Sequence, residues 1–356
     1  MIEKYILEHI EKYPEMEIAD VVKLIYQSEF GGGHMIKNPK ASLERLTREC
    51  QEADVDALQE YPLCWEKIGN HMGRLFLKGI ERHLKLDTVN RFFVNTAQKV
   101  TSSVPAFEEK LSELQRMCRE GTLPFDCEQL DEWLRVYRER GYPLFGHSES
   151  FRRHYHPSYR VVSGDYLEYI ELFSVIDRSF KAEEQLTIAI DGRCGSGKSW
   201  LARLLSGVYP CSVVHMDDFF LRPEQRTEER LKEIGGNVDR ERFLEEVARP
   251  LMNGRKSFEY QRYDCVRQKF TDSVKIQRKK LLVVEGTYSC HPLFSHLYDL
   301  KIFLNIESGA QRERILKRNG DYMLRRFISE WIPKEEEYFQ TFGIREACDI
   351  IFEETT

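Results

Sequence analysis

The sequence has no apolar run that approaches the roughly 18 residues needed to span a bilayer. Its first residues carry charges throughout and lack the apolar core of a secretory signal. Its nine cysteines stand singly, without a C-x-x-C pair. This excludes a disulfide framework and a zinc module of the usual spacing. We therefore expect a cytoplasmic protein with reduced thiols and no membrane partner.

The chain of 356 residues also lacks a marked excess of either charge, with 53 basic and 59 acidic residues and a net charge of −6. The whole excess falls in the first 180 residues, which hold 24 basic and 30 acidic residues. Because a nucleic-acid backbone is bound by a positive surface, nucleic acid is not the partner we expect. The composition, 41% hydrophobic and 31% charged, is that of a globular protein of about two domains.

Two regions with different patterns divide the chain. Through residues 1–165 apolar residues recur at helical spacing, as at Ile6 and Ile10, which predicts a mainly α-helical domain. Residues 166–182 are expected to form a connecting helix, and residues 183–356 a second domain. Within the first domain we expect helices at about Pro39–Gln59, Pro105–Glu120 and Cys127–Arg140, a turn with a short apolar run at 68–77, and an irregular connection at 141–164.

The second domain alternates short apolar runs with charged stretches of helical character. The runs are rich in Val, Ile and Leu, as is typical of strands buried on both faces. They lie at Leu186–Ile190, Ser212–Met216, Leu281–Val284, Ile302–Ile306 and Asp349–Phe352. This alternation predicts an α/β domain with a parallel sheet flanked by helices.

A glycine-rich motif follows the first of these runs. Residues 192–199 fit G-x-x-x-x-G-K-[ST], the pattern of a loop that holds nucleotide phosphates. An apolar strand enters the loop and a helical stretch leaves it, which is the context that phosphate binding requires. We expect Lys198 to reach the β- and γ-phosphates of ATP and the Ser199 hydroxyl to bind Mg²⁺. The predicted nucleotide-binding residues are Gly192, Arg193, Cys194, Gly195, Ser196, Gly197, Lys198 and Ser199.

Acidic residues follow two other predicted strands. Asp217 and Asp218 come after one, and Glu285 after another. The carboxyl ends of parallel strands form the ligand-binding edge of such sheets. A phosphotransferase needs one carboxylate that accepts the hydroxyl proton and one on the metal side. We assign Asp217 as the base, with Asp218 as the reserve, and Glu285 as the metal-side acid. The alternative is that these acids only cap turns.

A basic helical stretch, residues 311–318, lies further along the chain. Arg314 and Arg318 are four residues apart and share one helical face. Arginines on the mobile lids of phosphotransferases stabilise the charge on the transferring phosphoryl group. We expect this role for both arginines. The alternative is a solvent-exposed helix stabilised by ion pairs.

With these motifs, residues 183–356 resemble the uridine kinase/phosphoribulokinase family of P-loop kinases. The segment 216–220, Met-Asp-Asp-Phe-Phe, resembles the family's Asp-x-Phe-Tyr motif, whose Asp is the catalytic base. Residues 237–243 resemble its acidic segment before a helix that contacts substrate, and Tyr263-Asp264 resembles its substrate-loop motif. The resemblance implies substrate contacts at Phe220, Asp239, Tyr263 and Asp264. The charges of Arg222 and Arg267 would suit an acceptor that bears phosphate, or are simply solvated.

These residues together predict an ATP-dependent kinase that uses Mg²⁺ and transfers the γ-phosphoryl group to a hydroxyl of a small molecule. A nucleoside, a sugar and their phosphates are all open as acceptor. Phe220 replaces the family's tyrosine, and the histidine usual in its nucleoside kinases after Tyr263-Asp264 is absent. One alternative is a nucleotide-driven switch or sensor whose N-terminal domain is a binding module. Whether the chain forms a homo-oligomer is open.

A glycine run in the first domain indicates a second site. Glu29 and His34 stand on either side of Phe30 and three successive glycines, which often mark close approach of the chain to a ligand. Together with Arg74, these two residues would form the site, and the protein would then be a bifunctional enzyme. The alternative is a flexible turn between two helices.

Overall fold

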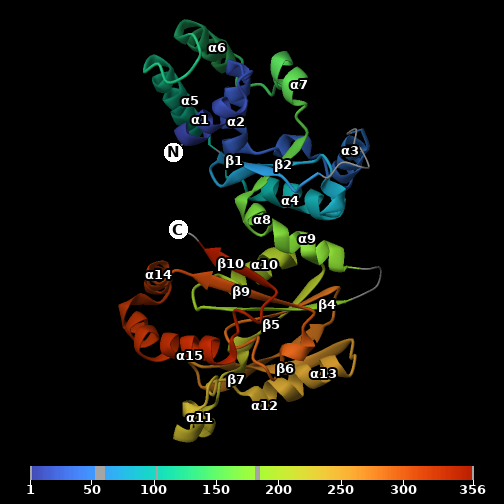
Figure 1. The fold of residues 1–356 in the computed structure, drawn as a ribbon, viewed down its shortest axis with the longest axis vertical. Helices are drawn as coiled ribbons and strands as arrows, with labels where there is room; N and C mark the ends of the chain where they lie inside the picture. Colours follow the sequence, from blue (N-terminus) through green and yellow to red (C-terminus); the bar gives the residue numbers. More distant parts are fainter. Residues whose placement is uncertain (1, 53–60, 102, 181–184, 355–356) are drawn as a thin grey trace. The chain divides into compact units, whose positions relative to one another are not determined.

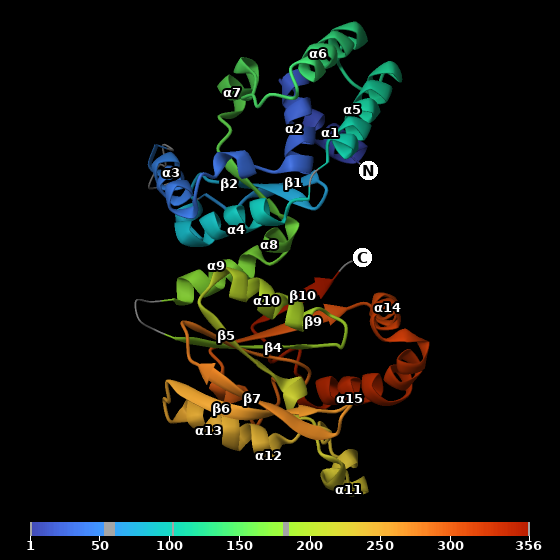
Figure 2. The ribbon, with the colours of Figure 1, turned by 180° about the vertical axis from the view of Figure 1, so that it is seen from behind.

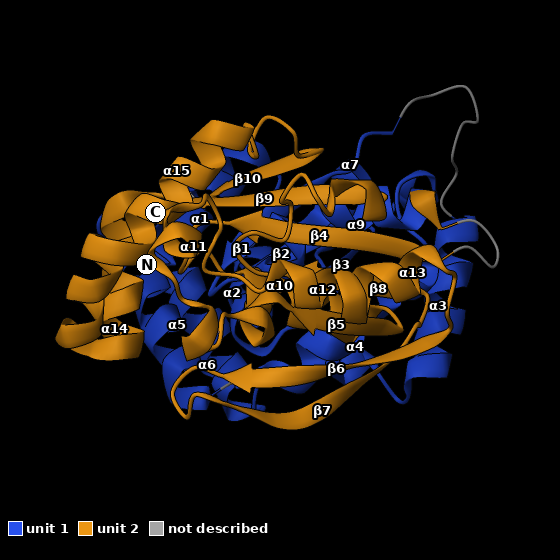
Figure 3. Ribbon diagram, turned by 90° about the horizontal axis from the view of Figure 1, so that it is seen from below, with its two compact units in different colours: residues 1–178 blue, residues 179–356 orange. Residues whose placement is uncertain are grey.

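The computed structural model describes residues 2–52, 61–101, 103–180 and 185–354. The chain divides into two compact units, residues 1–178 and 179–356, which Figure 3 shows in different colours. Each unit has a hydrophobic core of its own, one around Val21 and Phe107 and the other around Val214 and Phe303. Within the described ranges, no helix has the length and apolar character that a membrane span requires.

The first unit is mainly helical, as predicted (Figure 1). Its amphipathic helices bury one face each, as α2 does with Val21, Leu24 and Ile25. The expected helix over residues 39–59 is present as far as Glu52, and residues 53–59 lie outside the described residues. The helices are α1 (Glu3–Lys12), α2 (Ile18–Phe30), α3 (Pro39–Glu52), α4 (Leu86–Lys99), α5 (Val104–Arg119), α6 (Cys127–Glu139), α7 (Glu149–Tyr155), α8 (Gly164–Glu168) and α9 (Ile170–Ser179).

The first unit also contains a three-stranded antiparallel sheet in the order β1-β2-β3. Strands β1 (Trp65–Gly69) and β2 (Met72–Phe76) form a hairpin whose turn residues, Asn70 and His71, both have positive φ angles. Strand β3 (Tyr159–Ser163) pairs with β2 and corrects the expected irregular connection over 141–164. The pairing joins segments far apart in the sequence, which local composition does not reveal.

The second unit is built on a parallel five-stranded sheet with the order β10-β9-β4-β8-β5. All five predicted strands are present, and the central β4 is buried at every position. Figures 1 and 2 show helices α10 (Lys198–Val208) and α15 (Ile332–Phe342) on opposite sides of this sheet. The strands are β4 (Leu186–Gly192), β5 (Cys211–His215), β8 (Leu281–Glu285), β9 (Leu300–Ile306) and β10 (Ile350–Glu354).

Between β5 and β8 the chain forms an antiparallel hairpin of β6 (Ser257–Asp264) and β7 (Lys269–Gln277). The sequence interpretation was wrong here, because it expected a charged, helix-like stretch. In β6 buried Phe258 and Tyr260 alternate with exposed Glu259 and Gln261, the two-residue period of a strand with one buried face. The remaining helices are α11 (Glu228–Lys232), α12 (Arg240–Phe243), α13 (Arg249–Met252) and α14 (Ser308–Arg326).

Candidate functional site

The glycine-rich motif forms the turn between β4 and α10. At Gly192 the φ angle is 134°, and an added Cβ would lie 2.1 Å from the carbonyl oxygen of Leu304 on the neighbouring strand. No larger residue therefore fits there. Gly197 also has a positive φ, 95°, but an added Cβ would meet no atom within 4 Å, so the loop faces open space at this point. The N-terminus of α10 begins at the next residue and points its amide groups at that space.

Two side chains of the loop fit a phosphate ligand. The buried Lys198 ammonium donates to the carbonyl oxygens of Gly192 at 2.6 Å and Arg193 at 2.9 Å. The Ser196 hydroxyl is buried and has no hydrogen-bond partner in the described part of the chain. Both groups would gain stronger, charge-assisted hydrogen bonds from phosphate oxygens. Ser199, in the first turn of α10, is exposed.

Asp191, the residue before the motif, fixes the end of β4. Its fully buried carboxylate accepts from the backbone N–H of Gly192 at 2.7 Å and of Cys290 at 2.9 Å, and from the Tyr338 hydroxyl at 2.8 Å. Burial raises the pKa of Asp191, an effect that these hydrogen bonds oppose. The carboxylate thus ties the phosphate loop to the segment after β8 and to α15. Sequence analysis missed this role.

Helix α15 holds the loop through two adjacent acids. Glu335 is buried and accepts from the Cys194 N–H at 3.0 Å and the Thr287 hydroxyl at 3.1 Å. Burial raises the pKa of Glu335. Glu336 forms an ion pair with Arg193 at 2.7 Å. Sequence analysis missed both acids, because the run Lys-Glu-Glu-Glu is typical of a solvent-exposed helix.

The first part of α14 also contacts the loop. Gln311 is buried and donates to the carbonyl oxygen of Cys194 at 3.0 Å, and Arg314 donates to that of Gly195 at 3.1 Å. Arg318, one turn further along, is exposed and donates to the side chain of Asn319. The helix is interrupted at Gly320, whose φ and ψ of 78° and 170° are not helical. Arg314 therefore contacts the phosphate loop, and Arg318 lies one helical turn after Arg314 on the same helix.

Glu285 is the last residue of β8, and Asp217 lies in the short 3-10 helix that follows the neighbouring strand β5. The buried Glu285 is opposite His215 in the β5–β8 register, and its carboxylate lies 2.5 Å from the His215 Nδ1. This hydrogen bond is the main reason why the pKa of His215 is raised. The Asp217 side chain is exposed to solvent at its surface. The surrounding protein atoms nevertheless displace water from around its carboxylate. That desolvation, and then repulsion by Glu285, raise the pKa of Asp217, while the Lys198 charge opposes the change.

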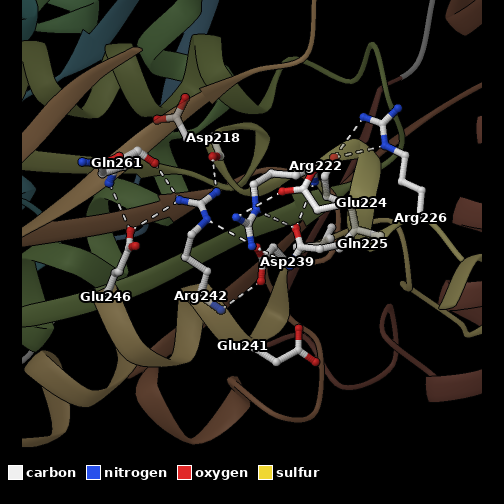
Figure 4. Close-up of polar contacts among 12 residues, drawn as sticks. Asp218, Arg222, Glu224, Gln225, Arg226, Asp239, Glu241, Arg242, Glu246 and Gln261 are labelled. Atoms are coloured by element: carbon white, nitrogen blue, oxygen red, sulfur yellow. Dashed lines mark hydrogen bonds and ion pairs between the residues drawn. The ribbon is translucent and has the colours of Figure 1, made fainter. Parts of the chain in front are cut away.

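Asp218 is held by protein partners, unlike Asp217. Its carboxylate accepts from the Tyr260 hydroxyl at 2.8 Å and from Arg262 at 3.1 Å. Its backbone carbonyl accepts from Arg242 at 2.6 Å, a contact drawn in Figure 4. The Asp217 carboxylate has no hydrogen-bond partner among the described residues. The geometry therefore leaves Asp217 available for a ligand and gives Asp218 a structural role.

Three of the predicted substrate residues are brought together after β5. Asp239 is buried, caps α12 by accepting from the Arg242 N–H, and accepts from the Gln225 side chain at 3.0 Å. Gln225 in turn accepts from Arg222, as Figure 4 shows. Phe220 forms an isolated bridge with Val238. Arg222 is thus linked through Gln225 to Asp239, and Arg242 contacts both Asp239 and the backbone carbonyl of Asp218.

The other three predicted substrate residues lie where β6 turns into β7. Tyr263 is buried, and its hydroxyl has no hydrogen-bond partner in the described residues. The Asp264 carboxylate accepts from the N–H groups of Val266 and Arg267, both at 2.9 Å, and so closes the turn. The Arg267 side chain is exposed. Tyr263 alone of these three presents a buried group that lacks a partner.

The predicted second site in the first unit is not assembled as expected. The Glu29 carboxylate accepts from Lys110 at 2.7 Å and from the Ser103 N–H at 3.2 Å. Arg74 is buried and bonds to Gln27 and Glu66. His34 lines a different cavity from the one that Glu29 lines, and Arg74 lines neither. The described structure thus does not bring Glu29, His34 and Arg74 together around one space.

No protein-family model and no curated protein matches the sequence. Among solved structures, a possible uridine kinase from Bacillus stearothermophilus is similar at 20% identity and a TM-score of 0.40, covering 53% of this chain and 96% of that one. A D-glycerate 3-kinase from Cryptococcus neoformans is similar at 14% identity and a TM-score of 0.31, covering 45% of this chain and 82% of that one. The N-terminal half is unmatched.

Proposed function

We propose that the second unit is an ATP-dependent kinase that transfers the γ-phosphoryl group to a hydroxyl of a small molecule in the cytoplasm. The observation that carries this proposal is the unpartnered carboxylate of Asp217, which lies within the influence of both Lys198 and Glu285. A carboxylate placed in this way can accept a hydroxyl proton. A nucleotide-driven switch needs no such group, so the site favours a kinase over that alternative.

The phosphate loop would bind the nucleotide through Lys198 and the amides that lead into α10. Lys198 now donates to two loop carbonyls, and phosphate oxygens would take their place. The amide of Cys194 is engaged by Glu335 and the side chain of Arg193 by Glu336. We therefore propose that Arg193 and Cys194 maintain the conformation of the loop. The direct contacts to the phosphates would come from Gly195, Ser196, Gly197 and Lys198, and Ser199 would lie on the metal side.

Ser199 and Glu285 would hold Mg²⁺ beside the bound nucleotide. Among the residues the structure describes, no group of three or more His, Cys, Asp and Glu could hold a metal ion. Proteins usually bind Mg²⁺ through one or two carboxylates together with substrate phosphates, and the Glu285 carboxylate with the Ser199 hydroxyl is a donor set of that kind. When bound, the ion neutralises charge on the phosphate oxygens. His215 keeps the Glu285 carboxylate oriented through their hydrogen bond.

Asp217 would accept the proton of the attacking hydroxyl. Its raised pKa makes it a stronger base than an ordinary aspartate. Arg314 and Arg318 would stabilise the charge that spreads over the transferring group, Arg314 from its present position at the loop.

The acceptor would lie between the segment after β5 and the β6–β7 hairpin. Tyr263 offers a buried hydroxyl without a partner, and the guanidinium of Arg222 lies 5.7 Å from the ring of Phe270 on the same hairpin. Phe220 and Asp239 belong to the same region. Asp264 and Arg267 would meet an acceptor only at the hairpin turn. A nucleoside, a sugar or a phosphate of either remains the proposed acceptor class.

The test is a screen with γ-labelled ATP and Mg²⁺ against nucleosides, sugars and their phosphates. We expect label in one organic product, lost in Lys198→Ala and kept in Lys4→Ala, which changes an exposed lysine of the first unit. Release of labelled inorganic phosphate at a rate that no acceptor changes would favour the switch. Label transfer that survives Lys198→Ala would overturn the proposed site.

A further inference from the structure

The first unit contains a cavity that the kinase chemistry does not use. Its volume is about 60 Å³, and it lies between α2, the turn after it, α4, α6, the segment 144–145 and β3. Such a volume accommodates roughly four to six water-sized groups, which is the size of the head of a small organic molecule. Much of its lining is aromatic or aliphatic, including Tyr26, Phe93, Leu144 and Phe145.

Three basic residues, Lys23, His34 and Arg160, line the cavity, and its described lining contains no acidic residue. The Arg160 charge is compensated, because its guanidinium lies 2.5 Å from the Glu49 carboxylate. Lys23 instead donates to the backbone carbonyl of Phe145 at 2.7 Å and has no ion pair among the described residues. The cavity thus carries positive charge that the protein does not neutralise.

The titration of neighbouring groups agrees with this excess charge. Burial, and then the Arg74 charge, lower the pKa of Lys23, and the Asp20 charge opposes this only in part. Burial, followed by the charges of Lys23 and Arg45, lowers the pKa of His34. An anion in the cavity would reverse both effects.

A buried hydroxyl without a partner lines the same cavity. Tyr137 is only 4% exposed, and its hydroxyl forms no hydrogen bond in the part of the chain that the structure describes. Its ring is fixed by Trp133, Tyr142 and Phe145. A buried hydroxyl without a partner is costly, and an oxyanion in the cavity would satisfy it.

The polar side chains on one side of the cavity already form hydrogen bonds with one another. Arg74 donates to the Gln27 oxygen, and the Gln27 amide donates to the Tyr159 oxygen. The Tyr159 hydroxyl donates to Nε2 of a neutral His147, whose Nδ1–H donates to Asp20. Burial lowers the pKa of His147, which favours the neutral ring in this arrangement. These hydrogen bonds hold the side chains of Gln27 and Tyr159 in place. Lys23, His34 and Tyr137 are the lining residues that can donate to a ligand.

We propose that this cavity is a binding site for a small organic acid, with its carboxylate on Lys23, His34 and Tyr137 and a short apolar body against the aromatic lining. A monoanion suits the site better than a phosphate group, because one uncompensated ammonium in an apolar surrounding balances one charge. The site is independent of the proposed kinase activity.

The test is titration calorimetry on the full chain carrying Lys198→Ala, so that the phosphate loop does not bind the added anions. The probes are butyrate, isovalerate and benzoate, with butyramide as the uncharged analogue and inorganic phosphate as the competing anion. We expect saturable binding of at least one carboxylate at one site per chain, and none of butyramide or phosphate. No saturable carboxylate binding would overturn the proposal, and tighter binding of phosphate would overturn its carboxylate assignment.

Variants locate the site. We expect Lys23→Met to weaken carboxylate binding at least tenfold and Tyr137→Phe, which removes only the hydroxyl, to weaken it severalfold. Lys40→Met changes an exposed lysine on α3 and should leave binding unchanged. If Lys23→Met fails to fold, Tyr137→Phe decides. Wild-type affinity in a folded Lys23→Met protein, or in Tyr137→Phe where that variant decides, would overturn the proposal.

Discussion

Asp217 and Asp218 are neighbours in the sequence, but their carboxylates lie in different surroundings and so can serve different roles. Asp218 accepts hydrogen bonds from Tyr260 and Arg262, whereas Asp217 has no protein partner among the described residues and is repelled by Glu285. A group that the fold holds on two sides cannot also be free to meet a substrate. At the scale of single residues, this difference separates the proposed base from its structural neighbour.

The two aspartates should therefore respond differently when each is changed to asparagine. Asp218→Asn weakens the bonds to Tyr260 and Arg262, and we expect the free energy of unfolding to fall by about 1–3 kcal/mol. Asp217→Asn removes a charge that is repelled by Glu285, and we expect stability to be kept or slightly raised. Urea unfolding of the two variants measures this. A larger loss of stability in Asp217→Asn would show that Asp217 has a structural role.

Residues of the phosphate loop could be predicted because their spacing lies within eight consecutive positions. Asp191, Gln311 and Glu335 could not, although they hold the loop in place. The partners of Gln311 and Glu335 at Cys194 lie 117 and 141 residues away in the sequence, so no local pattern marks them. The roles assigned to Asp217 and Glu285 remain predictions, which the structure makes geometrically reasonable.

At the scale of elements, one buried histidine links the segment after β8 to α15. His291 is 5% exposed and its ring stacks on Tyr338, with the two centroids 6.1 Å apart. Its Nδ1 accepts from the Leu293 N–H, so the ring is neutral and carries its one proton on Nε2. Burial, and then the Arg240 charge, lower the pKa of His291 from 6.5 to about 4.

This histidine should make the second unit less stable in mild acid. The folded protein binds the proton of His291 less tightly than the unfolded chain does. Stability is therefore lost as pH falls through 6.5, and the loss ends near pH 4. The full loss is on the order of 3 kcal/mol. His291→Gln should flatten the pH dependence of unfolding between these values, and His296→Gln, an exposed histidine nearby, should not. Equal slopes in all three proteins would refute this explanation.

The five parallel strands could be predicted because each contains a short run rich in aliphatic residues. The three central strands and β5 are largely buried, whereas the edge strand β10 is partly exposed. The hairpin β6–β7 and strand β3 were missed for different reasons. The hairpin is polar on its exposed face, so its charges suggested a helix although the alternation of Phe258 and Tyr260 was present. Strand β3 is stabilised by pairing with β2, about 90 residues earlier in the chain, and only the tertiary structure shows this pairing.

At the scale of the whole molecule, the first unit has a negative net charge, whereas the cavity around Lys23 within it is positive. The six excess acids all lie in residues 1–178. The cavity around Lys23 is nevertheless positive, because Arg74, Glu66, Asp20 and their partners neutralise one another in a separate network. The net charge indicates that nucleic acid is not the expected partner. Because it is a sum over the unit, it does not reveal the proposed local site for a small anion.

Separate cores and separate sites predict separate responses to ligands. We expect calorimetric unfolding of the full chain to resolve two transitions, because each unit has its own core. Mg·ATP should raise the temperature of one transition, and the carboxylate that binds the first unit should raise the other. At a ligand concentration 100 times Kd the stabilisation is about 2.7 kcal/mol. A single transition that both ligands raise equally would show that the two units unfold together.

The most direct measurement of the central claim is single-turnover transfer from bound γ-labelled ATP to the acceptor found in the screen. We predict that Asp217→Asn binds Mg·ATP as tightly as the wild type but transfers the phosphoryl group roughly 10²–10⁴ times more slowly. Asp218→Asn, measured where it is folded, should transfer it at a rate closer to that of the wild type. Transfer by Asp217→Asn at the wild-type rate would contradict the assignment of the base, and with it the proposed kinase site.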